Sequence, residues 1–210
     1  MKFNALVSHT PALHFRNRQF VRVIAGQAGG MRLQAPAGST TRPTSDRVKE
    51  ALFSILASCD RIEKATVLDL FAGSGSPGIE ALSRGAERAT FIDKSRTAIA
   101  SLQCNLIHTR LAHQAEVLQM DSSHAVERLA RHHEQFTLVL LDPPYQAGLH
   151  LKTIELMSAT AILAPDGLLV AETATRTPLP ERIGQCIRSD RRIYGDTALD
   201  FFMLEPHHAP

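Results

Sequence analysis

The chain has 210 residues, of which 44% are hydrophobic, and its formal net charge is +2. This length allows one α/β domain with a small appendage, and no apolar run approaches the roughly 20 residues of a membrane span. Three widely spaced cysteines, Cys59, Cys104 and Cys186, predict reduced, mostly buried thiols in a cytoplasmic protein and argue against a disulfide framework or a metal site.

Basic residues are concentrated at the start of the chain. Residues 1–45 hold six Lys or Arg and no Asp or Glu. A positive arm on a mildly acidic body favours a polyanionic partner, although a solvated tail explains the same composition. We expect residues 1–19 to form a flexible extension, because they show no clear periodicity.

Residues 20–58 are predicted to form a basic β-hairpin followed by a helix. The segment FVRVI alternates apolar and basic residues, and glycines separate it from MRLQAP, which is typical of a hairpin. Its outward side chains would include Arg22 and Arg32, and both could contact phosphates. A helix over residues 46–57 follows, with an apolar face and a Thr-Ser pair that can cap its start.

Residues 59–210 alternate between strand and helix patterns. The predicted strands cover residues 65–71, 88–93, 114–120, 136–141 and 167–172, and the predicted helices cover residues 77–84, 95–108, 122–133 and 148–162. This rhythm indicates a parallel sheet with helices on both faces. Residues 187–194 and 197–204 flank Gly195-Asp196 and predict an antiparallel hairpin. We therefore expect an α/β fold with a seven-stranded, mostly parallel sheet that ends in this hairpin.

A glycine turn lies at the centre of this pattern. The segment ATVLDLFAGSGSPGIE predicts a buried strand, a tight turn and a helix N-terminus, an order typical of nucleotide binding. Gly73 and Gly75 let the backbone approach a ligand closely. With Gly78, and with Asp93 twenty residues after Gly73, the spacing also fits a dinucleotide fold. The turn alone thus predicts an adenosine-containing cofactor without saying which one.

Acidic residues mark the carboxyl ends of the predicted strands, where ligands bind in open α/β sheets. Asp93 can accept hydrogen bonds from both ribose hydroxyls, and Asp121 with the Ser122 backbone N–H can bind the adenine edge. Asp69 would face a positively charged end of the cofactor. Each acid taken alone fits a helix cap or a turn equally well. Their shared position favours a binding site.

The segment Asp142-Pro143-Pro144-Tyr145 is the most specific signal in the sequence. Two prolines end the strand and fix the backbone, so the Pro143 carbonyl can point into the cleft. Together with the Asp142 side chain it offers two acceptors to an exocyclic amino group. Tyr145 offers a flat face on which a base can stack. The pattern predicts a site that acts on a nucleobase amine, and a simple strand-ending turn is the alternative.

These residues resemble class I methyltransferases, which have a Rossmann-like fold and use S-adenosylmethionine to methylate exocyclic amino groups of nucleobases. In that group, Asp, Asn or Ser followed by two prolines and an aromatic residue ends the fourth strand. The order VRVIAG, TRPTSDRVKEALFSIL, LDLFAGSGSPGIEALSRGA, LLDPPY and YGDTALDFF, over residues 20–205, is similar to the bacterial 16S ribosomal RNA guanine-N2 methyltransferase family often called RsmD.

The resemblance implies the following assignments. The cofactor would be S-adenosylmethionine, bound by Asp69, Phe71, Ala72, Gly73, Ser74, Gly75, Asp93, Lys94, Asp121, Ser122 and Asp142. The catalytic residues would be Asp142, Pro143, Pro144 and Tyr145, and the RNA would contact Arg22, Arg32, Arg42, Thr44, Arg47 and Tyr145. The partner would be 16S rRNA in a 30S subunit or an assembly intermediate. We expect a monomer that needs neither a membrane nor a metal, since the His132-His133 and His207-His208 pairs have no partner at ligand spacing.

Two other functions are compatible with the sequence. The tetrapeptide also fits an N6-adenine methyltransferase that acts on DNA or RNA, although the basic hairpin and the RPTSDR segment favour ribosomal RNA. A nucleic-acid-binding protein that keeps the cofactor fold without catalysis would not need the acids and the tetrapeptide together.

Overall fold

The computed structural model describes residues 21–36, 46–144 and 148–205. Its strands are β1 (Val21–Arg22), β2 (Arg32–Leu33), β3 (Thr66–Leu70), β4 (Arg88–Asp93), β5 (Ala115–Gln119), β6 (Phe136–Leu141), β7 (Leu163–Ala174), β8 (Arg182–Ile183), β9 (Cys186–Tyr194) and β10 (Thr197–Leu204). Its helices are α1 (Asp46–Ser58), α2 (Ser76–Ser83), α3 (Arg96–His108), α4 (Ser122–Arg131) and α5 (Leu149–Ser158), with one 3₁₀ turn at Ala112–Gln114. The predictions for residues 1–19, Arg42, Thr44 and Tyr145 lie outside the described residues.

The main sheet has the strand order β5-β4-β3-β6-β7-β10-β9-β8. Strands β3 to β7 pair in parallel, and β10, β9 and β8 pair antiparallel with their neighbours. The chain leaves β3 toward β4 and β5 and then returns to β6 on the other side, so the strand order reverses at β3. Ligands bind at such a reversal, outside the carboxyl ends of the strands. The predicted α/β fold with its closing hairpin is confirmed.

The sheet differs from the prediction in its last third. The two-residue strand β8 adds an eighth member, and it is too short to leave a pattern in the sequence. Strand β7 is longer than the predicted 167–172, because Leu163 pairs with Phe136 and Ala174 pairs with Thr197. Pro165 and Asp166, which the prediction placed outside any strand, lie within β7.

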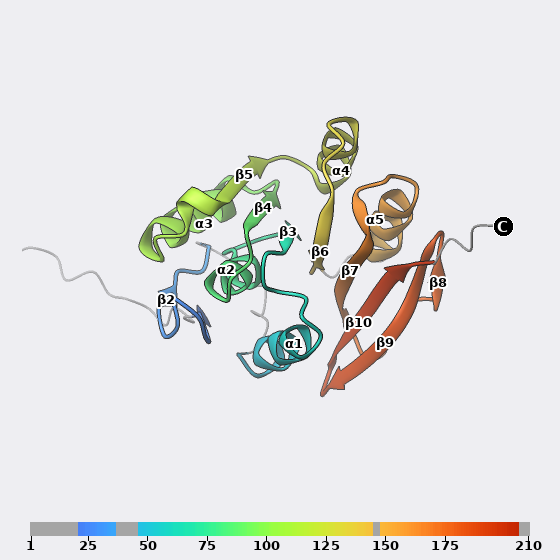
Figure 1. The fold of residues 1–210 in the computed structure, drawn as a ribbon, viewed down its shortest axis with the longest axis horizontal. Coiled ribbons are helices and arrows are strands. Elements are labelled where there is room, and N and C mark those ends of the chain that lie inside the picture. Colours follow the sequence, from blue (N-terminus) through green and yellow to red (C-terminus); the bar gives the residue numbers. More distant parts are fainter. Residues whose placement is uncertain (1–20, 37–45, 145–147, 206–210) are drawn as a thin grey trace, which may run out of the picture.

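Helices cover both faces of the sheet (Figure 1). Helices α1, α2 and α3 pack against one face in a core that includes Phe53, Ile79 and Leu102. Helices α4 and α5 pack against the other face, where Val126 and Ile154 are fully buried. This double coverage agrees with the unbroken apolar runs of the central strands.

The N-terminal hairpin is packed into the first of these cores. Val23, Ala28 and Leu33 are almost completely buried in the same cluster as α1 and α2. In strands β1 and β2, Arg22 lies opposite Arg32. Both arginines are exposed, so they share the outer face of the hairpin, whereas Val21 and Leu33 beside them are buried.

The cysteines correct one prediction. Cys186 is buried, and burial raises the pKa of its thiol to about 11. Cys59 and Cys104 are exposed, so the expectation of mostly buried thiols was wrong. Cys104 lies on α3 and Cys59 follows α1, and both are open to solvent rather than packed in a core. No helix in the described part of the chain is long and apolar enough to cross a membrane.

Candidate active site

Four of the predicted site elements lie along the carboxyl edge of the parallel strands. Asp121 follows β5, Asp93 ends β4, the glycine turn follows β3 and Asp142 follows β6. Because β5, β4, β3 and β6 are consecutive neighbours, the sheet brings these residues into one row. The row is continued by Glu172, near the end of β7.

The glycine turn has the backbone that its sequence predicts. Gly73 and Gly75 have φ values of 56° and 80°, which side chains with a Cβ rarely adopt. The Gly75 N–H donates to the Ala72 carbonyl at 2.7 Å, and Gly75 caps α2. Phe71 also has a positive φ of 66°, a strained conformation for a bulky residue. The strained segment is the one predicted to hold the cofactor.

Asp93 fixes this turn from the neighbouring strand. Its carboxylate accepts hydrogen bonds from the Gly73 N–H at 2.9 Å and from the Ser95 N–H at 2.8 Å. Each carboxylate oxygen has two lone pairs, so both retain capacity for ribose hydroxyls. A Cβ on Gly73 would approach nothing closer than 3.9 Å, so the space above it is open to a ligand. These residues fit an adenosine-containing cofactor.

Asp121 is a helix cap. Its side chain accepts a hydrogen bond from the Ser123 N–H at 2.9 Å and so caps α4. The carboxylate is exposed, whereas Ser122 is buried. Lys94 is also exposed, just beyond Asp93. The cap positions Asp121 at the edge of the row, where its contact with adenine stays a prediction.

Asp69 lies beneath the glycine turn rather than on its surface. It is only 3% exposed and accepts a hydrogen bond from the Gly78 N–H at 3.0 Å. Burial raises the pKa of this carboxyl group to about 7, against the effect of the Gly78 hydrogen bond. A Cβ on Gly78 would lie 2.9 Å from the carboxylate and 2.3 Å from the Phe91 ring. Glycine at position 78 therefore permits the close approach of α2 to β3 and β4.

Asn105 supports the same turn from α3, and the sequence did not single it out. Its side-chain amide donates to the Ser74 carbonyl at 2.9 Å and to the Gln34 carbonyl at 3.0 Å, and its oxygen accepts from the Gln34 N–H. Asn105 is 1% exposed. One buried side chain thus joins the glycine turn to the segment after β2. A polar residue on the apolar face of the helix is the signal that could have marked it.

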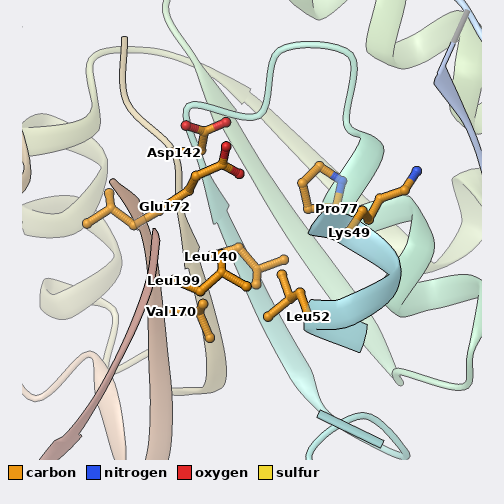
Figure 2. A pocket seen from close by; sticks show the side chains of 9 residues that line it. Lys49, Leu52, Pro77, Leu140, Asp142, Val170, Glu172 and Leu199 are labelled. Atoms are coloured by element: carbon orange, nitrogen blue, oxygen red, sulfur yellow. The ribbon is translucent and has the colours of Figure 1, made fainter. Parts of the chain in front are cut away.

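Asp142 lies at the mouth of a pocket that is also lined by Pro77, in the first turn of α2 (Figure 2). The enclosed space of the pocket is small, about 20 Å³, and the pocket opens to solvent. Its lining consists of Lys49, Leu52, Pro77, Leu140, Leu141, Asp142, Val170, Glu172 and Leu199. Asp142 and Glu172 provide the acidic part, and leucines and Val170 provide an apolar floor. Pro143 is buried, whereas Asp142 and Pro144 on either side of it are exposed.

Comparisons with known proteins place the chain in a family. A sequence profile described as Conserved hypothetical protein 95 matches residues 21–203. Ribosomal RNA small subunit methyltransferase D of Escherichia coli (strain K12) is 40% identical over 185 residues, which cover 88% of this chain and 90% of that protein. The chain belongs to the RsmD-type family.

Solved structures agree with this assignment. The yhhF protein of Escherichia coli superimposes on the RsmD-type chain with a TM-score of 0.77 and 34% identity, covering 89% of this chain and 99% of that one. An S-adenosylmethionine-dependent methyltransferase of Agrobacterium tumefaciens gives a TM-score of 0.66 at 17% identity, covering 93% and 72% of the two chains. At that identity the likeness concerns the fold alone.

The predicted RNA-binding arginines of the RsmD-type chain lie on its outer surface where they are described. The exposed Arg22 pairs with Asp46, with Nε 3.0 Å from Oδ2. Arg32 lies opposite Arg22 in the hairpin, and Arg47 is exposed at the start of α1. The three arginines therefore come from adjoining segments. Their contact with RNA stays a prediction.

Lys49 and Glu80 form a buried polar centre that the sequence did not reveal. Glu80 accepts hydrogen bonds from the backbone N–H groups of Ile24 and Ala25 at 2.6 and 3.0 Å, and Arg84 Nε donates to it at 2.7 Å. Lys49 donates to the Ser76 hydroxyl at 2.9 Å and to the Arg22 carbonyl. These contacts tie the hairpin and α1 to the first turns of α2. The acid within the apolar run Ile79-Glu80-Ala81-Leu82 was the available signal.

In the described ranges, no three His, Cys, Asp or Glu side chains gather in a way that could hold a metal ion. His132 and His133 are exposed at the end of α4, as expected for surface residues. His207 and His208 lie outside the described residues.

Proposed function

We propose that this protein transfers a methyl group from S-adenosylmethionine to the exocyclic N2 of one guanine in small-subunit ribosomal RNA. The observation that carries the proposal is the position of Asp142, which follows β6 and lines a pocket next to the glycine turn. A carboxylate there can hold an amino group close to the cofactor. The RsmD-type family supports ribosomal RNA as the substrate.

The cofactor would be held by the row of residues at the carboxyl edge. The Gly73 N–H is already directed at Asp93, which would accept the ribose hydroxyls. Asp69 lies beneath the turn with a pKa of about 7, and the nearby ammonium and sulfonium groups would favour its ionised form. The fold likeness to an S-adenosylmethionine-dependent enzyme supports this choice of cofactor.

Asp142 and the Pro143 carbonyl would prepare the guanine amine for reaction. The N2 lone pair is delocalised into the ring, which makes it a poor nucleophile. Two hydrogen bonds donated by N2 to these acceptors favour a pyramidal nitrogen whose lone pair is free to react. The consecutive prolines keep both acceptors in place, so alignment supplies much of the rate.

The reaction ends when the methylated nitrogen loses a proton. When bound, S-adenosylmethionine supplies a methyl carbon on a positively charged sulfur, and the electron pair of the broken C–S bond stays on sulfur. The nitrogen becomes positive as the new N–C bond forms, and it then loses one proton. Asp142 or water in the open mouth of the pocket can accept that proton. The atoms and charges balance with these groups.

The surroundings of the pocket suit a large polyanionic substrate. Lys49 bonds to the backbone of Arg22, so the basic hairpin lies beside the pocket wall. Arg22, Arg32 and Arg47 would contact phosphates and orient the RNA without reading its sequence. We propose 16S rRNA in a 30S subunit or an assembly intermediate as the partner of a monomeric, cytoplasmic enzyme.

Methyl transfer from labelled S-adenosylmethionine tests the proposal. The purified protein is incubated separately with small-subunit rRNA, with partly assembled 30S particles and with duplex DNA. We expect label at a guanine N2 in one of the first two. Label in DNA, or at adenine N6 in either nucleic acid, would overturn the proposed guanine substrate. It would favour the N6-adenine methyltransferase that the tetrapeptide also allows.

A further inference from the structure

Two carboxylates stand at the same level on one side of the pocket. Strands β6 and β7 are parallel, and Leu141 pairs with Ala171. Asp142 and Glu172 each come one residue later, so they are level with each other. Leu140 and Val170, two residues before them, line the pocket on the same face of the sheet. Figure 2 shows both acids on the β6 and β7 side, across from Pro77 and Lys49.

Glu172 is held in this position from both sides of its strand. The backbone carbonyl of Glu172 accepts a hydrogen bond from His150 Nε2 at 2.7 Å, and burial lowers the pKa of this histidine. On β10, Leu199 pairs with Glu172 and also lines the pocket. The position of the Glu172 backbone is therefore set by α5 and by two neighbouring strands.

Lys49 lies across the pocket from the two acids. Lys49 lines the pocket with its aliphatic stem, and its Nζ turns away toward Ser76 and the Arg22 carbonyl (Figure 2). The side of the pocket that carries Asp142 and Glu172 brings carboxylate oxygens close to leucine and valine side chains. A ligand with two adjacent donors on a flat apolar body fits this arrangement.

We propose that Glu172 selects guanine by accepting the N1–H hydrogen bond while Asp142 holds the N2 amino group. This inference rests on the proposed function and adds the residue that specifies the base. On its Watson–Crick edge guanine presents N1–H and the N2 amino group as adjacent donors. Two level carboxylates on neighbouring strands match those two donors, since an ionised carboxylate accepts hydrogen bonds only.

The same pair of acids rejects adenine. Adenine places its N6 amino group next to an N1 that carries a lone pair and no hydrogen. If the amino group met Asp142, the N1 lone pair would face the Glu172 carboxylate. Two acceptors in a partly desolvated pocket repel each other and leave both groups unpaired. Asp142 alone does not make this distinction, because both bases offer it an amine.

A base analogue isolates the Glu172 contact. 2-Aminopurine keeps the amine to be methylated at C2 but has no hydrogen on N1. Small-subunit rRNA is ligated from fragments that carry either guanine or 2-aminopurine at the mapped target position. The ratio of kcat/KM for guanine to kcat/KM for 2-aminopurine is then measured for the wild type and for Glu172→Gln. The amide can donate to a bare N1, whereas the carboxylate cannot. 2-Aminopurine also lacks the O6 of guanine. This loss affects the wild type and Glu172→Gln alike, so it cancels when the two ratios are compared.

We expect the wild type to prefer guanine by about tenfold or more, and Glu172→Gln to reduce that preference by about tenfold. Glu181→Gln, an exposed glutamate on another segment, is the matched control and should keep the wild-type ratio. Binding of S-adenosylhomocysteine, measured by calorimetry, checks that Glu172→Gln is folded.

The outcomes separate this inference from the proposed function. A wild type that methylates guanine N2 but treats 2-aminopurine equally well, or a Glu172→Gln ratio that stays at the wild-type value, overturns the role of Glu172 and leaves the function intact. A wild type that methylates no guanine overturns both.

Discussion

Glu80 and Lys49 form a buried ion pair, with Lys49 Nζ 3.8 Å from the Glu80 carboxylate and neither side chain more than 1% exposed. The pair lies between the N-terminal hairpin, α1 and α2. Burial lowers the pKa of Lys49, and Glu80 opposes that change. The glycine turn directly precedes α2, so this polar centre couples the proposed cofactor loop to the basic hairpin.

Glu80→Gln should destabilise the protein by about 3–5 kcal/mol, because it leaves Lys49 charged and buried without its carboxylate. Urea unfolding gives the free energy of unfolding for both proteins. Glu134→Gln is the matched control, since Glu134 pairs with Arg88 at the surface and should cost less than about 1 kcal/mol. Equal costs for the two substitutions would show that the buried pair has no special structural role.

Asp69 should make stability depend on pH. Its folded pKa of about 7 lies above the ordinary 3.8, so the unfolded chain loses this proton first as pH rises. Stability attributable to Asp69 is therefore retained below pH 4 and lost between pH 4 and 7, by on the order of 4 kcal/mol. Asp69→Asn removes this loss.

The measurement is the difference in unfolding free energy between Asp69→Asn and the wild type across this range. The unfolding free energy of Asp69→Asn should rise relative to that of the wild type from pH 4 to pH 7. Above about pH 8 the difference should stop changing with pH. Asp60→Asn, at an exposed position, supplies the baseline. A difference that does not vary with pH would mean that Asp69 titrates at its ordinary value in the folded protein.

Gly75→Ala should damage the cofactor loop more than Gly85→Ala. Both glycines have a positive φ, so alanine strains the backbone in each case, by about 1–2 kcal/mol. At position 75 the new Cβ would also lie 2.2 Å from the Leu102 side chain, whereas at position 85 it would meet nothing within 4 Å. We expect Gly75→Ala to weaken S-adenosylhomocysteine binding by about tenfold, or 1.4 kcal/mol. Unchanged affinity would place the cofactor elsewhere.

Arg22→Gln combined with Arg32→Gln should reduce the salt dependence of RNA binding. Each arginine–phosphate interaction that is removed lowers the slope of log affinity against log salt by about 0.7–0.9. Substitution is preferable to deletion, because Val23 and Leu33 of the same hairpin are core residues. Arg182→Gln is the control, since Arg182 pairs with Glu205 at the far edge of the sheet. An unchanged slope in the double variant would remove the hairpin from the RNA interface.

The sequence predicted the elements whose signals are local. The fold was indicated by the alternation of apolar runs. Most site residues at the carboxyl ends of the strands were indicated by the glycine turn and by the double proline after β6. Helix α5 was predicted to reach residue 162 but ends at Ser158, because the next residues lead into β7.

Residues that depend on distant partners were missed. Glu80 is stabilised by backbone N–H groups more than fifty positions earlier, and Asn105 binds a segment seventy-one positions earlier. Glu172 lies level with Asp142 because of the register of β7 against β6, and no local sequence pattern predicts that register. Burial of such polar groups is decided by tertiary packing, so single-sequence periodicity cannot reveal it.

The most direct test of the central claim is mass mapping of methylated nucleotides in small-subunit rRNA. The rRNA is taken from cells that lack the protein and from the same cells after complementation with wild type or Asp142→Ala. We predict that one N2-methylguanosine is missing without the protein, returns with the wild type, and does not return with Asp142→Ala although that variant still binds S-adenosylhomocysteine. An unchanged guanine pattern, loss of an N6-methyladenosine instead, or full restoration by Asp142→Ala would contradict the account.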